Sequence, residues 1–249
     1  MLKAIKSIVD NPIIKIKDYY SGRNRANSVG EALENYVKDI FANSFDLPET
    51  ERLQKINKVF SYLGNQNNPP DIILRNGDAI ETKKVQNQTS SLALNSSYPK
   101  SKLFVDSPML QNACKNCEDW TEKDIIYIVG HTNDTDLKHL WFVYGDCFAA
   151  DKEVYEKIKK TISSGITEIP DVEFTETKEL GKVKKVDPLG VTDLRIRGMW
   201  HIDNPQKIFS YLNKVDTNAK FQVLCLMKTE KFNSFPTSDK TALQNLIKN

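Results

Sequence analysis

Several features that define other classes of protein are missing from this sequence. No apolar run in its 249 residues approaches the ~20 that a membrane-spanning helix needs. Residues Met1–Lys6 do not open an apolar stretch of the kind that forms the core of a signal peptide. No internal repeat or low-complexity segment stands out. These absences argue against a membrane protein, and we expect a cytoplasmic location.

Cysteine is scarce, with four residues in the chain. Cys114 and Cys117 have the spacing of a zinc-ligand pair, but a structural zinc site needs four ligands and usually a second close pair. The remaining cysteine and histidine residues are single and scattered: Cys147, Cys225, His131, His139 and His201. Reduced thiols, the default in a cytosolic protein, are therefore favoured over zinc binding or a thioredoxin-like redox role.

Charge of one sign is not in excess either, because the formal net charge is only +2. The whole surface therefore carries no general basic field for nucleic acid. Within residues 1–30, basic side chains nevertheless outnumber the acidic ones, Asp10 and Asp18. The basic residues of this segment are Lys3, Lys6, Lys15, Lys17, Arg23 and Arg25. Such a segment could follow the phosphates of DNA, or it could be an ordinary solvated surface.

The most informative segment comprises residues 67–84. Two short apolar runs, Asp71–Leu74 and Ala79–Val85, predict two strands. Between them, Asn76–Gly77 is one of the strongest short-range hairpin signals, because glycine accepts a positive φ without steric cost. Side chains alternate along a strand, so Glu81 and Lys83 share one face of the hairpin.

The length of the turn decides whether Asp71 joins them. A strict two-residue turn would pair Asp71 with Thr82 and send the aspartate to the opposite face. A three-residue connection, Asn76–Asp78, would instead pair Asp71 with Lys83 and place all three charged groups together. We therefore predict the longer connection, or a bulge that corrects the register.

Asp71, Glu81 and Lys83 are the residue types that phosphodiester hydrolysis requires. A hard cation must neutralise the developing charge and lower the pKa of a bound water. Mg²⁺ prefers oxygen ligands and usually few from protein, so Asp71, Glu81 and the Thr82 carbonyl are the candidate ligands, with Mn²⁺ as a possible substitute. Lys83 would orient or help deprotonate the attacking water. The alternative is an exposed two-stranded ribbon with solvated charges.

The spacing of these residues resembles a known family. Pro70-Asp71, a nine-residue gap and then Glu81-Thr82-Lys83 resembles the motif of the PD-(D/E)xK nucleases, which include most type II restriction endonucleases. The longer strings 67–71 and 77–84 are similar to a subfamily of restriction endonucleases that cuts GGCC. The similarity continues in four later segments, so that it spans most of the chain: residues 112–120, 144–147, 187–190 and 194–200.

This resemblance implies a single restriction-endonuclease domain over residues 1–249. It implies an α/β fold with a mixed central β-sheet flanked by helices, the PD-(D/E)xK core. The implied activity is Mg²⁺-dependent cleavage of double-stranded DNA at a short palindromic GC-rich site, leaving 5′-phosphate and 3′-hydroxyl ends. A palindromic target calls for two-fold protein symmetry, so we expect a homodimer. A companion DNA methyltransferase of the same specificity is expected in the host, but not as a stable complex.

A fourth catalytic candidate comes from the same resemblance. Gly30-x-x-x-Glu34 is similar to the Gly-x-x-x-Glu of the first helix in many of these nucleases, where the glutamate approaches the metal site from behind. Glu34 could also face solvent, and Glu31 is the weaker candidate. Ser28 is expected to cap this helix, over residues 29–41.

The remaining pattern agrees with a layered α/β protein. Two nearly continuous apolar runs, 124–129 and 140–145, predict central strands covered on both faces. The other predicted elements are a strand at 221–227 and helices at 49–62, 151–164, 205–214 and from Ser238 onwards. Helices on both sides of a mixed sheet are the expected outcome.

Residues for contacting DNA are also recognisable. Residues 194–200 alternate like a strand, so Arg195 and Arg197 share a face. Arginine is the best bidentate reader of guanine in the major groove, although clamping of phosphate or surface ion pairs would use the same residues. The other predicted DNA contacts are polar or basic residues that end or follow the catalytic strand: Lys84, Asn95, Ser96, Ser97 and Lys100.

Two other functions compete with a restriction enzyme. A repair or recombination nuclease could use the same hairpin on junctions or DNA ends. A DNA-binding protein without catalysis could keep the acidic pair for structure. The intact set of Asp71, Glu81 and Lys83 favours catalysis over binding alone.

Overall fold

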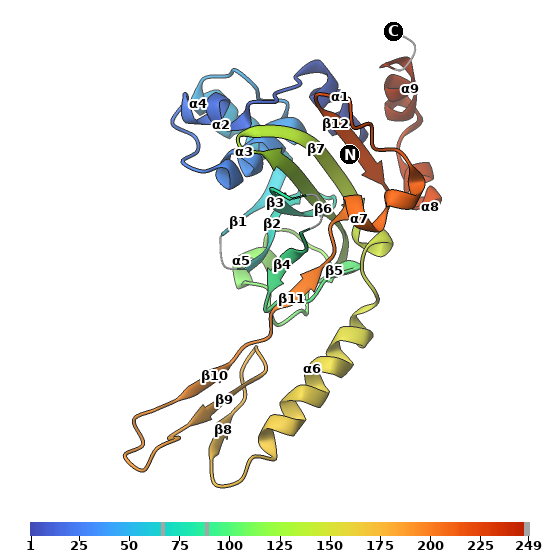
Figure 1. Cartoon of the computed structure of the whole chain (residues 1–249). Helices are drawn as coiled ribbons and strands as arrows, with labels where there is room; N and C mark the ends of the chain where they lie inside the picture. Colours follow the sequence, from blue (N-terminus) through green and yellow to red (C-terminus); the bar gives the residue numbers. More distant parts are fainter. Residues whose placement is uncertain (66–67, 88–89, 247–249) are drawn as a thin grey trace.

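A mixed β-sheet forms the centre of the molecule (Figure 1). The computed structural model describes residues 1–65, 68–87 and 90–246, and Asn67, the first residue of the informative segment, lies outside these ranges. Within them, seven strands pair in the order β1-β2-β3-β6-β7-β12, with β5 against β6. Their bounds are β1 Phe60–Asn65, β2 Asn68–Leu74, β3 Ala79–Val85, β5 Lys102–Phe104, β6 Glu122–Asn133, β7 Asp136–Tyr144 and β12 Gln222–Leu226. The predicted α/β class with a mixed sheet and flanking helices is confirmed.

The direction of the strands explains where the sheet is most buried. β3 runs parallel to β6 and β7 runs parallel to β12, whereas the other neighbouring pairs are antiparallel. β6 and β7 lie in the interior of the sheet and are buried over almost their whole length. The prediction of two central strands covered on both faces is confirmed, because apolar side chains on both faces of a strand require two covering layers.

Helices from the N-terminal part cover one face of the sheet (Figure 1). Their bounds are α1 Leu2–Asp10, α2 Ile16–Ser21, α3 Val29–Ala42 and α4 Glu49–Val59. Leu33 and Val37 of α3 belong to the same core cluster as Ile128 of β6, so burial of this apolar stripe holds α3 on the sheet. Ser28 caps α3 as predicted, since its Oγ accepts a hydrogen bond from the Glu31 N–H at 3.1 Å.

The other face carries smaller elements. A two-stranded sheet of β4 (Leu92–Asn95) and β11 (Trp200–Ile202) lies over it, together with α5 (Asn112–Lys115) and α7 (Pro205–Ile208). Trp141 is buried here, in a second apolar cluster that includes Leu92 and Ile202 of the small sheet. This layer supplies the loop that follows β4, and that loop forms one wall of the candidate site.

Residues 152–197 extend away from this body and are called the arm (Figure 1). The arm consists of α6 Lys152–Thr167 and a three-stranded sheet of β8 Glu173–Thr175, β9 Gly181–Lys184 and β10 Leu194–Ile196, in the order β10-β9-β8. Within these residues only Glu179 and Val183 are buried. At the base of the arm, Tyr155 stacks on Tyr98 with ring centroids 5.2 Å apart and meets Trp200 edge-on at 5.5 Å.

The strands predicted at 124–129 and 140–145 are longer in the structure, as β6 and β7. Three other predicted elements are cut short or divided. The helix predicted at 49–62 ends at Val59, because the following residues enter β1 and pair with β2. The helix predicted at 205–214 is only α7 followed by a 3₁₀ turn, η2 (Ser210–Leu212). The strand predicted at 194–200 is divided between β10 and β11. The chain also contains η1 (Gly145–Cys147) and ends in α8 (Thr229–Ser234) and α9 (Thr237–Leu246), the latter beginning near the predicted Ser238.

None of the helices in the described ranges is long and apolar enough to cross a membrane.

Candidate active site

The β2–β3 hairpin has the three-residue connection predicted from the sequence, but in a different position. Ile72 pairs with Ile80 and Ile73 with Ala79. The Leu74 N–H donates to the Asp78 carbonyl at 3.0 Å, so the connection is residues 75–77 and not 76–78. Asn76, rather than the following glycine, adopts the left-handed conformation, with φ of 52°.

This register still places the charged residues on one face. If the register of these two pairs is continued by one residue, Asp71 lies opposite Glu81. The predicted pairing of Asp71 with Lys83 is therefore wrong. The two registers differ by two residues, and a shift of two keeps every side chain on its face. A hydrogen bond to the neighbouring strand holds the Asp71 side chain in place. The Thr82 N–H donates to Asp71 Oδ2 at 2.6 Å.

Glu81 and Lys83 are in direct contact. The Lys83 Nζ lies 2.7 Å from Glu81 Oε1. The other carboxylate oxygen, Oε2, is buried and has no hydrogen-bond partner among the described residues. A buried carboxylate oxygen without a donor is unfavourable, and a hard cation would satisfy it. The site therefore fits Mg²⁺, with two carboxylates to bind it. Across the described ranges no group of three or more His, Cys, Asp and Glu side chains is arranged to hold a metal, so water or backbone oxygens would complete the shell.

The surroundings shift the ionisation of these groups. Burial raises the pKa of Asp71 to about 7, the negative charge of Glu81 adds to this rise, and Lys83 and the Thr82 N–H oppose it. Burial alone would lower the pKa of Lys83, but the carboxylates of Glu81 and Asp71 outweigh this effect and raise it above the ordinary value. Near neutral pH, Lys83 is therefore a charged donor, and a proton competes with a cation for Asp71.

Glu34 reaches the site from α3, on the opposite face of the sheet. It is half-buried, and burial raises its pKa while Lys38 and Lys83 lower it. Its charge also raises the pKa of Asp71. Glu31 is occupied elsewhere, because its carboxylate accepts a hydrogen bond from the Asn27 N–H at 2.6 Å and completes the cap of α3. The structure therefore brings Glu34, and not Glu31, towards the catalytic candidates.

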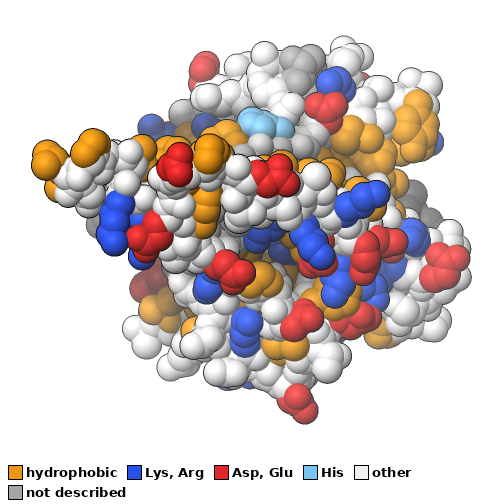
Figure 2. All heavy atoms as spheres, turned by 90° about the horizontal axis from the view of Figure 1, so that it is seen from below, with side chains coloured by type: hydrophobic (Ala, Val, Ile, Leu, Met, Phe, Trp, Pro, Cys, Tyr) orange, Lys and Arg blue, Asp and Glu red, His pale blue; other side chains and the backbone are white. Residues whose placement is uncertain are grey.

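A cavity of about 630 Å³ opens in front of the hairpin. It is lined by the three catalytic candidates and by most of the predicted DNA contacts: Asp71, Glu81, Lys83, Asn95, Ser96, Ser97, Lys100, Arg195 and Arg197. Figure 2, which views the molecule from the side of the arm, shows basic and acidic side chains gathered together on this face. Residues predicted separately from three parts of the sequence thus share one cavity.

Two of the predicted DNA contacts lie differently from expectation. Lys84 does not line the cavity, because alternation along β3 points it away from the face of Glu81 and Lys83. Lys100 is only 7% exposed, and its Nζ donates to Ser97 Oγ and to the Tyr98 carbonyl. Burial lowers the pKa of Lys100 to about 8. Lys100 therefore holds the loop after β4 from inside the protein and does not extend towards solvent.

Glu179 is a charged residue of the cavity that was not singled out in the sequence. Glu179, in the arm, is buried, and its carboxylate lies 2.7 Å from Arg195 Nε and 2.8 Å from Arg197 Nε. Both arginines therefore lie on the same side, as predicted, although Arg197 follows the end of β10. The signal that could have revealed Glu179 is electrostatic, because two neighbouring arginines on one face favour a nearby carboxylate.

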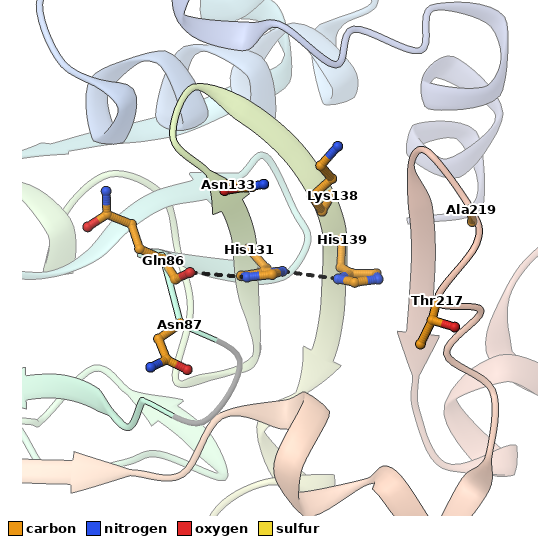
Figure 3. Close-up of a pocket in the computed structure, with 8 residues that line it drawn as sticks. All are labelled: Gln86, Asn87, His131, Asn133, Lys138, His139, Thr217 and Ala219. Atoms are coloured by element: carbon orange, nitrogen blue, oxygen red, sulfur yellow. Dashed lines mark hydrogen bonds between the residues drawn. The ribbon is translucent and has the colours of Figure 1, made fainter.

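A second cavity, of about 600 Å³, lies near the end of β3 and contains a histidine pair (Figure 3). His131 Nδ1 is 3.2 Å from His139 Nδ1, and His131 Nε2 is 3.2 Å from the Gln86 carbonyl oxygen. Burial lowers the pKa of both rings. The four cysteines are all free, including Cys114 and Cys117.

Comparison with known proteins identifies the family of the chain. The family model described as "NgoPII restriction endonuclease" matches residues 1–249. The curated protein "Type II restriction enzyme NgoPII" of Neisseria gonorrhoeae is 51% identical over 241 residues, which cover 96% of this chain and 87% of the relative. No solved structure matches the chain. The repair-nuclease and binding-only alternatives are set aside, and the chain belongs to the NgoPII family of type II restriction enzymes, which cleave DNA at specific sites.

Proposed function

We propose that the chain cleaves double-stranded DNA at a short palindromic GC-rich site, GGCC, by Mg²⁺-dependent hydrolysis that leaves 5′-phosphate and 3′-hydroxyl ends. The observation that supports this most is the shared cavity. It is lined both by Asp71, Glu81 and Lys83 and by two exposed arginines, so a phosphate and a base edge can be bound close together.

The catalytic half of the proposal concerns the hairpin. Asp71, Glu81 and the Thr82 carbonyl are the proposed ligands of Mg²⁺, with Mn²⁺ able to replace it. When bound, the ion would lower the pKa of a water and offset charge on the phosphate. The unpaired Oε2 of Glu81 supports this assignment, since among the described residues this buried acceptor has no donor.

Lys83 has a narrower role than the sequence allowed. The raised pKa keeps its amine protonated near neutral pH, so we assign it the orientation of the attacking water and the stabilisation of charge on the phosphate. Its contact with Glu81 at 2.7 Å holds the ammonium group beside the proposed metal ligands. Glu34 adds negative charge behind the site, and we propose that it strengthens cation binding from α3.

The recognition half concerns the arm and the loop after β4. Arg195 and Arg197 are proposed to read guanines, which a GC-only target supplies. Asn95, Ser96 and Ser97 line the same cavity and carry groups that bind bases or phosphate oxygens. Lys100 supports this loop from below through Ser97.

A palindromic site implies a homodimer, because two equal half-sites are matched by two equal subunits. The arm offers a surface for the second copy, since Val154, Ile158 and Ile162 of α6 are 51%, 43% and 43% exposed. We also propose that the protein acts in the cytoplasm, beside a methyltransferase of the same specificity that forms no stable complex with it.

The test is the digestion of unmethylated plasmid DNA with Mg²⁺ or with EDTA, followed by sequencing of the ends. Discrete fragments that require Mg²⁺ and whose ends map to GGCC sites in the plasmid are expected. Glu81→Ala and Lys83→Ala should abolish cutting while leaving DNA binding measurable. Full activity in either variant would contradict the assignment, and ends at another sequence would correct the target alone.

A further inference from the structure

Glu179 occupies an unusual position between the arm and the catalytic cavity. Its side chain is only 6% exposed, whereas those of Arg195 and Arg197 are 62% and 60% exposed. A single buried carboxylate thus holds two guanidinium groups that otherwise extend into the cavity. Removing a carboxylate from water is unfavourable unless cations and hydrogen bonds compensate, and here both arginines do so.

The contacts leave the outer parts of both guanidinium groups free. Each arginine uses its Nε towards Glu179, at 2.7 and 2.8 Å. Among the described residues, the terminal nitrogens of Arg195 and Arg197 have no other partner. A guanidinium group that is held through Nε keeps its terminal N–H groups for a planar, two-point acceptor such as a guanine edge.

Glu179 is also tied to the body of the protein. Ser96 Oγ, in the loop after β4, donates to Glu179 Oε1 at 3.4 Å. The next residue, Leu180, donates its N–H to the carbonyl of Ile196, the residue between the two arginines, at 3.3 Å. Glu179 is therefore tied through the neighbouring Leu180 to the segment that carries the arginines, and through its carboxylate to a loop that lines the cavity of Glu81.

We propose that Glu179 is the positioning residue for sequence recognition, which aligns Arg195 and Arg197 for two guanines of the target. The inference rests on the proposed function, in which these arginines read bases. Without the carboxylate, two adjacent positive charges would repel each other and each guanidinium group would rotate freely. The protein would still bind the DNA backbone, but it would lose discrimination between sequences.

The test compares Glu179→Gln with the wild type for binding to two duplexes, with Ca²⁺ in place of Mg²⁺ to suppress cleavage. One duplex carries the site found by sequencing the cut ends, and the other carries the same bases in scrambled order. The ratio of the two affinities should fall about tenfold or more, since one bidentate contact discriminates between bases by that factor. Binding to the scrambled duplex should be unchanged or stronger, because a negative charge has been removed.

Glu173→Gln is the matched control. Glu173 lies on β8 in the same arm, but its carboxylate pairs with Lys185 and touches neither arginine. This variant should keep the wild-type ratio. A second control repeats Glu179→Gln in the background of Arg195→Ala and Arg197→Ala, where it should have no further effect on the ratio, since residues that act through each other are not additive.

The outcomes distinguish a failure of the proposed function from a failure of the role of Glu179. If the wild type cuts no DNA, or if the arginine variants keep the ratio, the proposed function or its arginine assignment fails. If the arginine variants lose the ratio but Glu179→Gln keeps it, or if Glu173→Gln loses it equally, the role of Glu179 is refuted. Should Glu179→Gln not fold, Glu179→Asp decides: its carboxylate is one methylene shorter, and an unchanged ratio in that variant would overturn the positioning role.

Discussion

Replacing Asp71 by asparagine should stabilise the metal-free protein while abolishing cleavage. Asp71 lies in a half-buried position beside Glu81, and its pKa is raised from 3.8 to about 7. The asparagine is nearly the same size, and its Oδ1 can still accept the hydrogen bond that the Thr82 N–H donates at 2.6 Å. The substitution therefore removes the charge and leaves the packing in place.

The sign of the effect follows from proton binding. The folded state holds a proton on Asp71 more tightly than the unfolded state, so the stabilisation from that proton is complete below pH 3.8 and is lost as the pH rises through about 7. A difference of about three pKa units corresponds to about 4 kcal/mol of unfolding free energy. The amide introduced by Asp71→Asn does not titrate, so the variant keeps this stability above pH 7.

The assay is thermal unfolding in EDTA over a series of pH values. At about pH 8 the variant should melt roughly 10 °C above the wild type, because 1 kcal/mol shifts Tm by about 2–4 °C in a chain of this size. The difference should shrink steadily below pH 7. Added Mg²⁺ should raise the Tm of the wild type near pH 8, less so in acid, and should not raise that of the variant in the same way.

A matched surface substitution provides the control. Asp203 lies at the surface with 43% of its side chain exposed, and hydrogen bonds from Lys207 and Ser91 lower its pKa, so Asp203→Asn should not stabilise the protein at any pH. A variant Asp71→Asn that melts at or below the wild type near pH 8, or whose advantage does not grow with pH, would refute the reasoning.

Four further outcomes test other parts of the site. Lys83→Ala should abolish cutting in the plasmid digest, which corresponds to a single-turnover rate lower by at least about a hundredfold, while gel shift shows that DNA binding in Ca²⁺ persists. Glu34→Gln should raise the Mg²⁺ concentration needed for half-maximal rate, because a negative charge near Asp71 is lost; an unchanged titration would place Glu34 outside the site. Lys100→Met should leave the salt dependence of DNA binding unchanged, whereas a slope smaller by about one would show that Lys100 reaches a phosphate. Ile158→Asp, alone or with Ile162→Asp, should shift sedimentation towards a monomer; an intact dimer would place the interface elsewhere.

The parts of the fold that were predictable from sequence are those with local signals. Alternation in Ala79–Val85 was enough to place Glu81 and Lys83 on one face, and the hairpin signal was enough to expect a turn between the two strands. The three-residue connection was inferred from the chemistry, because only an odd connection brings Asp71 to the same face. The register was wrong by two residues, because it depends on which groups close the turn, here the Leu74 N–H and the Asp78 carbonyl. An even shift does not change the face, so the grouping of the site survived this error.

The parts that were not predictable depend on contacts distant in sequence. Strands β8 and β9 of the arm carry few apolar residues. They are strands because β9 pairs with β8 on one side and with β10 on the other. No local sequence pattern singles out Glu179. Its role depends on ion pairs with two arginines that lie 16 and 18 residues later. Lys100 was expected to contact DNA, and only the enclosing loop and Tyr127, whose Oη accepts the Lys100 N–H, show that it is buried.

The arm buries few side chains, and this low burial affects how recognition and cutting are connected. With only Glu179 and Val183 buried in residues 152–197, little free energy of folding is local to this segment, so its amides should exchange with solvent far sooner than those of β6. Contacts with a bound molecule would restrict the motion of a segment with such low local stability. A matching DNA site would supply those contacts, and the conformational entropy lost in ordering the arm would then be subtracted from the affinity for the correct sequence. The enzyme would thereby bind its target less tightly than its contacts allow and release the cut product more readily.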